Sequence, residues 1–256
     1  MKQSNYLFKD ARLSSYYFAK EILPSLFTII NTPSSIVDLG GGLGGWCKAF
    51  QEYGVLNTNC IDHPSINLND LLINKNNFIP CNFEVDMPPL LKSDLAVCIE
   101  FAEHIKTKLS SKIVNYLTSC SNTILFSAAI PGQGGLGHIN EQWPFFWVEA
   151  FQRESFHFLD VIRPLIIEND KIPYYLRQNI FLIVHEDVLS NFNKNHSYNF
   201  NTNEWSLVHR SILNKRHLKN RIKNILPRSL KGRLEVWRYV IDSKFNKKKN
   251  SIYKKN

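Results

Sequence analysis

The sequence predicts an α/β protein whose doubly wound sheet of seven strands carries helices on both faces. Two observations favour this class. Short apolar runs alternate with stretches of helical periodicity through the first 190 residues, as expected where crossover helices join parallel strands. The first run leads into a glycine-rich turn, IVDLGGGLGGW at residues 36–46. A strand, a glycine turn and a helix start suit a nucleotide-type ligand, because the backbone approaches closely and offers free N–H groups.

The expected elements follow from periodicity and from the turn residues between them. Residues 14–30 have helical spacing, and Pro24 is expected to divide this helix into two pieces. Further helices are expected at 47–53, 106–119 and 145–156. Strands are expected at 35–39, 56–62, 77–83, 93–100, 122–130, 157–162 and 178–185. The near-continuous apolar run at 93–100 is typical of a strand that is covered on both faces.

Composition indicates an ordered globular body. The chain has 256 residues, of which 44% are hydrophobic and 12% aromatic, so a sizeable core can form. No apolar run approaches the roughly 18–20 residues of a membrane span, and the N-terminal segment lacks the apolar region of a secretory signal. The five cysteines form no CxxC pair. We therefore expect reduced thiols and a cytoplasmic protein.

Positive charge is concentrated near the C-terminus. Residues 210–256 hold 16 Lys and Arg against 2 Asp and Glu, whereas the first 209 residues hold 15 against 20. We expect a folded domain over 1–190, a polar linker over 191–209 and a basic amphipathic helical tail over 210–256. Such a tail suits the anionic inner face of a membrane. Nucleic acid, and packing on the protein's own body or on a second copy, are the alternatives.

Asp62 stands at the expected end of the second strand. It follows Asp38 by 24 residues, close to the ~20-residue separation of a carboxylate that holds ribose hydroxyls. An ordinary turn residue is the other interpretation of an acid at a strand end. The spacing indicates a ribose contact at the edge where parallel sheets bind ligands.

A second group of polar side chains follows the fourth and fifth strands. Glu100, Glu103 and His104 form an ExxEH cluster, and His138 lies in the later loop. Adjacent parallel strands bring their carboxyl ends to one crevice, so these four side chains could converge. Oxygen and nitrogen ligands of this kind suit Mg²⁺, Mn²⁺, Fe²⁺ or Zn²⁺. Without a metal, His138 or His104 is the candidate general base, and His104 could instead orient a substrate or cap a helix.

These motifs resemble those of the class I S-adenosylmethionine (SAM) methyltransferases, which have a Rossmann-like seven-strand sheet. VDLGGGLGGW resembles their first motif, D-x-G-x-G-x-G, here Asp38, Gly40, Gly42 and Gly44. The resemblance implies that the glycines pass close to the methionine moiety of SAM and that Asp62 holds the ribose. It places Asn82 at the adenine amino group, where an acid is usual but an amide oxygen can also accept.

A narrower resemblance covers residues 34–186. DLAVCIEFAEHI, LFSAAIPGQGGLGHINEQWPFFW and RQNIFLIV are similar to segments of small methyltransferases found with bacterial glycan-biosynthesis genes. The ExxEH run with a later histidine is similar to that of the small-RNA 3′-end 2′-O-methyltransferases, where it holds a metal; ubiquinone-pathway O-methyltransferases share the ExxEH run. The implied metal ligands are Glu100, Glu103, His104 and His138, with Glu100 also beside the cofactor.

The sequence therefore predicts a SAM-dependent O-methyltransferase acting on a hydroxyl of a sugar or glycan precursor, with Mg²⁺ or Mn²⁺ as the expected metal. Sugars offer vicinal hydroxyls, and a metal that binds two of them would acidify one. The expected catalytic residues are His104, His138 and Glu103, and the expected substrate residues are Gln133, Asn140, Glu141 and Trp143. RNA ribose 2′-O-methylation and a non-catalytic SAM-fold interaction protein are the alternatives.

Overall fold

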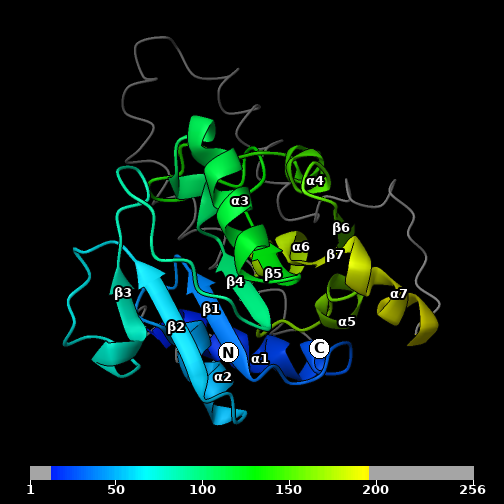
Figure 1. The fold of residues 1–256 in the computed structure, drawn as a ribbon, viewed down its shortest axis with the longest axis horizontal. Coiled ribbons are helices and arrows are strands. Elements are labelled where there is room, and N and C mark those ends of the chain that lie inside the picture. Colours follow the sequence, from blue (N-terminus) through cyan, green and yellow to red (C-terminus); the bar gives the residue numbers. More distant parts are fainter. Residues whose placement is uncertain (1–12, 196–256) are drawn as a thin grey trace, which may run out of the picture. The chain divides into compact units, whose positions relative to one another are not determined.

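The computed structural model describes residues 13–195 (Figure 1). Seven strands form one sheet in the order β3-β2-β1-β4-β5-β7-β6, which confirms the predicted fold class. The strands are β1 (Ser35–Leu39), β2 (Asn57–Asp62), β3 (Phe78–Pro80), β4 (Leu95–Ile99), β5 (Thr123–Ser127), β6 (Phe156–Leu159) and β7 (Phe181–His185). The helices are α1 (Ser14–Leu26), α2 (Gly45–Glu52), α3 (Ser110–Cys120), α4 (Pro144–Gln152), α5 (Arg163–Ile166), α6 (Tyr174–Asn179) and α7 (Glu186–Asn195).

The carboxyl ends of strands β1 to β5 lie at one edge of the sheet. Strands β1 to β5 pair in parallel, so their carboxyl ends lie together at what we call the carboxyl edge. β7 runs antiparallel to β5 and to β6. Phe126, near the end of β5, pairs with Phe181 at the start of β7. The amino end of β7 therefore also lies at the carboxyl edge.

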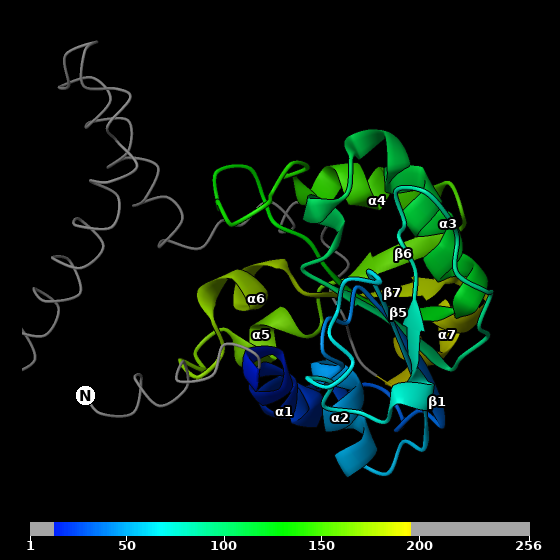
Figure 2. The same ribbon diagram turned by 90° about the vertical axis from the view of Figure 1, so that its left-hand side faces the viewer.

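A hydrophobic layer covers each face of the sheet. Figure 2 shows α1 and α2 on one side and α3 and α4 on the other. Successive strand residues point to opposite faces. Ile36 belongs to the same hydrophobic cluster as Leu26 on the first side, and Val37 belongs to the same cluster as Trp147 on the second. Burial on both faces explains why β4 and β7 are nearly continuous apolar runs.

Several boundaries differ from those expected. α1 runs unbroken to Leu26, so the predicted division at Pro24 is wrong. Pro24 stands in the final turn, so its missing N–H removes a single bond from a helix that ends two residues later. β3 is short, and Asn82 lies in the turn beyond it. α3 begins at Ser110, after 3₁₀ turns at Ala102–His104 and Thr107–Leu109. Gln178 lies in the last turn of α6 rather than at the start of β7.

The far end of the described chain is helical. α7 continues to Asn195, past the expected domain boundary at residue 190. Glu186 and Asp187 occupy its first turn, where the helix dipole favours acids. The remainder of the predicted linker, 196–209, and the predicted tail, 210–256, lie outside the described residues. Within residues 13–195, every helix is too short or too polar to cross a bilayer.

Candidate functional site

The glycine turn after β1 has a backbone that favours glycine. Gly40, Gly42 and Gly44 have φ values of +74°, +58° and +81°. A Cβ built on Gly40 would lie 2.2 Å from the Phe101 ring, so no side chain fits there. A Cβ on Gly42 would meet no atom of the described residues within 4 Å. The turn is thus packed against the protein at Gly40 and open at Gly42, as a loop that receives a ligand should be.

Asp62 closes this turn from the end of β2. Its Oδ2 accepts a hydrogen bond from the Gly42 N–H at 2.6 Å, and its Oδ1 accepts from the His63 N–H at 2.5 Å. A cavity of about 240 Å³ opens beside it. The cavity is lined by Asp62, His63, Cys81, Asn82, Phe83, Glu84, Phe101, His104 and Ile105. The structure therefore places Asp62 and Asn82, predicted as ribose and adenine contacts, around one space.

Asp38 lies beneath the turn rather than in the cavity. Its side chain is buried, and its Oδ2 has no hydrogen-bond partner among the described residues. A Cβ on Gly41 would lie 2.5 Å from that oxygen. Burial, with a contribution from the nearby Asp62 charge, raises the pKa of Asp38 to about 8. Asp38 is thus buried under Gly41 and is not among the residues that line the cavity.

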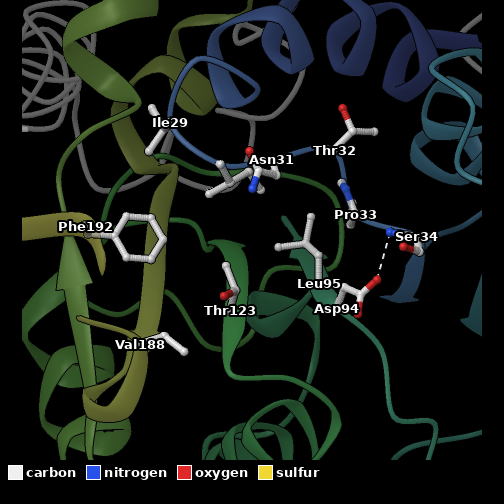
Figure 3. A pocket seen from close by; sticks show the side chains of 11 residues that line it. Ile29, Asn31, Thr32, Pro33, Ser34, Asp94, Leu95, Thr123, Val188 and Phe192 are labelled. Atoms are coloured by element: carbon white, nitrogen blue, oxygen red, sulfur yellow. Dashed lines mark hydrogen bonds between the residues drawn. The ribbon is translucent and has the colours of Figure 1, made fainter. Parts of the chain in front are cut away.

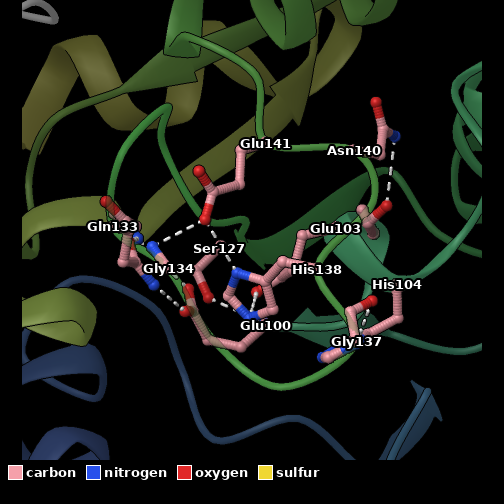
Figure 4. A network of polar contacts seen from close by, with 12 residues as sticks. Glu100, Glu103, His104, Ser127, Gln133, Gly134, Gly137, His138, Asn140 and Glu141 are labelled. Atoms are coloured by element: carbon pink, nitrogen blue, oxygen red, sulfur yellow. Dashed lines mark hydrogen bonds and ion pairs between the residues drawn. The ribbon is translucent and has the colours of Figure 1, made fainter. Parts of the chain in front are cut away.

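Glu103, His104 and His138 meet at the carboxyl edge (Figure 4). One ligand atom from each lies within 4.8 Å of the others. His138 Nε2 is 4.0 Å from Glu103 Oε1, and the two imidazole rings meet edge to face with centroids 5.0 Å apart. His104 also lines the cavity beside Asp62. The cluster and the cavity are therefore neighbours that share a side chain.

Glu103 is fully buried, and neither of its carboxylate oxygens has a hydrogen-bond partner among the residues that the structure describes. Burial and the nearby Glu100 carboxylate raise the pKa of Glu103 to about 9. Burial and the neighbouring His138 lower the pKa of His104. A buried polar group without a partner is costly, so a proton or a cation is the natural complement of Glu103.

Glu100 takes a different position from the other three predicted metal ligands. It has a φ of +51°, which is unusual for a residue with a side chain. Its Oε2 accepts from Gln133 Nε2 at 2.9 Å, and its Oε1 accepts from Asn179 Nδ2 at 3.3 Å. The structure thus brings three of the four expected ligands into one group and holds Glu100 beside it with two amides.

Asn179 is a site residue that the sequence analysis missed. It ends α6, directly before β7, and its Nδ2 also donates to Gln133 Oε1 at 2.8 Å. The signal was the polar pair Gln178–Asn179 at the start of an apolar run. This pair indicates a site residue only once β7 is known to be antiparallel, because that direction brings the amino end of β7 to the carboxyl edge.

Asn140 joins the loop after β5 to the ExxEH turn. The backbone N–H groups of Ile139 and Asn140 both donate to the Glu103 carbonyl oxygen, at 2.9 and 3.0 Å. The Asn140 side chain donates to the Ala102 carbonyl oxygen at 3.2 Å and to Ser110 Oγ at 3.1 Å. These contacts fix the distance between His138 and the turn that carries Glu103.

The four predicted substrate residues have unequal access to an acceptor. Gln133 and Asn140 are buried and bonded within the fold. Glu141 accepts hydrogen bonds from His138 and from the Gly132 and Gly134 backbone. The Trp143 side chain is 41% exposed. Trp143 alone among the four offers a free surface.

A second cavity, of about 480 Å³, lies at the opposite edge of the sheet (Figure 3). Its lining includes Ser34, Asp94 and Thr123, which precede or begin β1, β4 and β5, and Phe192 of α7. Parallel sheets bind ligands at their carboxyl ends. This larger cavity therefore stands apart from the cluster, and we do not assign the site to it.

Comparisons with known proteins agree with the α/β fold. Residues 10–127 match the model of a family described as a methyltransferase domain. No curated protein sequence matches the chain. The magnesium protoporphyrin IX methyltransferase of Synechocystis PCC 6803, solved with bound SAH (S-adenosylhomocysteine), is 13% identical, with a TM-score of 0.52 over 72% of this chain and 94% of that one. Its SAM-bound form is 15% identical, with a TM-score of 0.51 over 71% and 85%.

The chain spans only 43% of a solved structure described as a pericyclic reaction enzyme, with 14% identity and a TM-score of 0.41 over 59% of this chain. At these identities the solved structures establish the shared α/β fold. The match to a methyltransferase domain covers residues 10–127 of the same fold.

Proposed function

We propose that this protein is a SAM-dependent methyltransferase that transfers a methyl group to a hydroxyl of a sugar or glycan precursor. The observation that carries the proposal is the position of His104, which lines the cavity beside Asp62 and also belongs to the cluster with Glu103 and His138. A donor in the cavity would thus lie next to groups that can hold a hydroxyl and remove its proton.

The residues of the turn and the cavity fit the cofactor. The open space at Gly42 leaves room for the methionine moiety, and Asp62 is placed to accept hydrogen bonds from ribose hydroxyls. Asn82 and the rings of Phe83 and Phe101 surround the space for adenine. When bound, SAM supplies an electrophilic methyl group, so the protein must orient a nucleophile and receive its proton.

The cluster also fits a divalent metal such as Mg²⁺ or Mn²⁺. Glu103, His104 and His138 would hold it, and the Glu103 carboxylate, which has no hydrogen-bond partner among the described residues, would supply the complementary charge. A metal there would lower the pKa of a bound hydroxyl. His138 Nε2 is otherwise the group placed to accept the hydroxyl proton, because its other nitrogen faces Glu141.

A saccharide acceptor is supported by the chemistry of the site and by the motif resemblance. Neighbouring hydroxyls suit a cluster with several ligand atoms. Trp143 presents an exposed aromatic surface close in sequence to His138, and such a surface can stack on a sugar ring. The similar solved enzyme is named for a porphyrin acceptor, so its fold does not select a sugar.

The predicted membrane-surface contact belongs to this proposal. The basic segment 210–256 would hold the protein at the inner membrane face if the glycan precursor is attached to a lipid. Co-sedimentation of the full chain with anionic vesicles and with RNA, at two salt concentrations, would separate this role from nucleic-acid binding.

The experiment that tests the proposed activity uses methyl-labelled SAM with the purified full chain. Lipid-linked and nucleotide-linked sugars form one acceptor set, and small RNAs form the other. We expect label in the saccharide fraction, retained by His157→Gln on β6 and lost in His138→Gln. Label only in RNA would overturn the saccharide proposal, and failure to bind SAM or SAH in calorimetry would overturn the methyltransferase itself.

A further inference from the structure

The Glu141 carboxylate is held between the loop backbone and the His138 ring (Figure 4). Its Oε2 accepts from the Gly132 N–H at 2.7 Å, and its Oε1 accepts from the Gly134 N–H at 2.7 Å. The same Oε1 lies 3.1 Å from His138 Nδ1. Two backbone donors fix this carboxylate, so it cannot turn towards an acceptor without losing both bonds.

The contact determines where His138 carries its proton. An ionised carboxylate only accepts hydrogen bonds, so the ring nitrogen that faces it must donate. A neutral imidazole has a single N–H, and a proton on Nδ1 leaves the lone pair on Nε2. Nε2 is the nitrogen on the side of Glu103, 4.0 Å from its carboxylate. His138 therefore presents a lone pair, rather than an N–H, to the cluster.

We infer that Glu141 is a positioning residue that holds His138 in the Nδ1–H tautomer with Nε2 free to accept a proton or to bind a metal. This inference rests on the proposed function, in which His138 Nε2 is the working atom. It replaces the predicted role of Glu141 in substrate binding. Some histidines act as a general base and others bind a metal. In both cases a carboxylate at the second ring nitrogen sets the tautomer and the ring orientation.

The loop sequence explains why a glutamate is suited to this task. Gly132 and Gly134 turn their N–H groups towards the position that Glu141 occupies, and both have positive φ values of +89° and +67°. A glutamine at position 141 would keep the shape of the side chain but replace one acceptor oxygen by a donor. It could not satisfy both glycines and His138 at once.

The first test reads the tautomer directly in the metal-free protein. The full chain is labelled with ¹⁵N-histidine and studied at about pH 8.5, where an ordinary imidazole is neutral. The His138 signals are identified as those missing from His138→Gln. We expect a protonated Nδ1 and an unprotonated Nε2. An Nε2–H tautomer in the unmodified protein would overturn the inference, and this measurement needs no Glu141 variant to fold.

The second test compares Glu141→Gln with Glu149→Gln, which changes an exposed glutamate of α4. We expect Glu141→Gln to raise the Nε2–H population and to weaken Mn²⁺ binding by about 10–100-fold, the usual effect of losing a carboxylate behind a ligating histidine. Glu149→Gln should change neither. An unchanged tautomer in a folded Glu141→Gln protein would refute the role of Glu141. If the unmodified chain binds no Mn²⁺, the metal part of the proposed function fails. The tautomer measurement then still tests the role of Glu141, because it needs no metal.

Discussion

The backbone N–H of Asn140 donates to the carbonyl oxygen of Glu103 at 3.0 Å. This bond joins the loop after β5 to the turn after β4. The Asn140 side chain also donates to Ala102 and Ser110 and accepts from Thr107 Oγ1 and Gln142 Nε2. His138 and Glu103 stand directly beside this junction. A buried asparagine thus joins the two turns that carry His138 and Glu103.

Asn140→Ala should lower the free energy of unfolding. The change leaves the Ala102 carbonyl and the Ser110 hydroxyl without their buried donor, and we expect a loss of about 1–3 kcal/mol. Urea unfolding measures it. Asn76→Ala, at an exposed position, is the control and should change stability by less than about 0.5 kcal/mol. Equal effects at the two positions would contradict the role given to Asn140.

Gly42→Ala should weaken cofactor binding more than it weakens the fold. Gly42 has a φ of +58° and Gly54, in the turn after α2, has +88°. Within residues 13–195, a Cβ at either position would meet no atom within 4 Å. Both alanine variants should therefore lose a similar ~1–2 kcal/mol of stability from backbone strain. Only the methyl group at position 42 would project into the proposed path of SAM.

Calorimetry with SAH separates the two glycine variants. We expect an affinity at least about tenfold lower in Gly42→Ala, equivalent to ~1.4 kcal/mol, and no change in Gly54→Ala. Unchanged SAH affinity in Gly42→Ala would mean that the turn after β1 does not hold the cofactor.

Glu103→Met should stabilise the metal-free protein and abolish activity. Burial and Glu100 raise the pKa of Glu103 to about 9 from an ordinary value of 4.5. Between these pH values the folded protein keeps a proton that the unfolded chain releases. The stability of the parent therefore falls as pH rises through this range, whereas the methionine variant lacks this loss.

The measurement is urea unfolding with a chelator present, at about pH 6 and about pH 8.5, between the two pKa values of Glu103. The stability difference between Glu103→Met and the parent should widen at the higher pH. Glu149→Met, at an exposed position, should show no such widening. A constant difference for Glu103→Met would indicate that Glu103 ionises normally in the folded protein.

Removal of divalent metal should reduce methyl transfer. The Glu103, His104 and His138 ligand atoms lie within 4.8 Å of one another, and Glu103 has no other partner among the described residues. We expect excess chelator to suppress activity, added Mn²⁺ to restore it, and Mn²⁺ to raise the melting temperature of the parent but not of Glu103→Gln. Full activity in excess chelator would reject the metal and leave His138 as the general base.

The sequence alone determined the fold class and the local parts of the site. The run at 36–46 predicted a strand, a turn and a helix, and the structure has them as β1, three glycines with positive φ, and α2. Asp62 was identified by its spacing, and the ExxEH cluster by its composition. These features are encoded by residues close together in the chain, where steric limits on the backbone and the period of apolar side chains act directly.

Only the tertiary structure decided which side chains meet. It separated Glu100 from the group of Glu103, His104 and His138, and it assigned Glu141 and Asn140 to internal contacts rather than to the acceptor surface. It also brought Asn179 to the carboxyl edge, because β7 runs antiparallel to its neighbours. Strand direction and hydrogen-bond choice depend on packing between distant segments, and one-dimensional spacing does not contain that information.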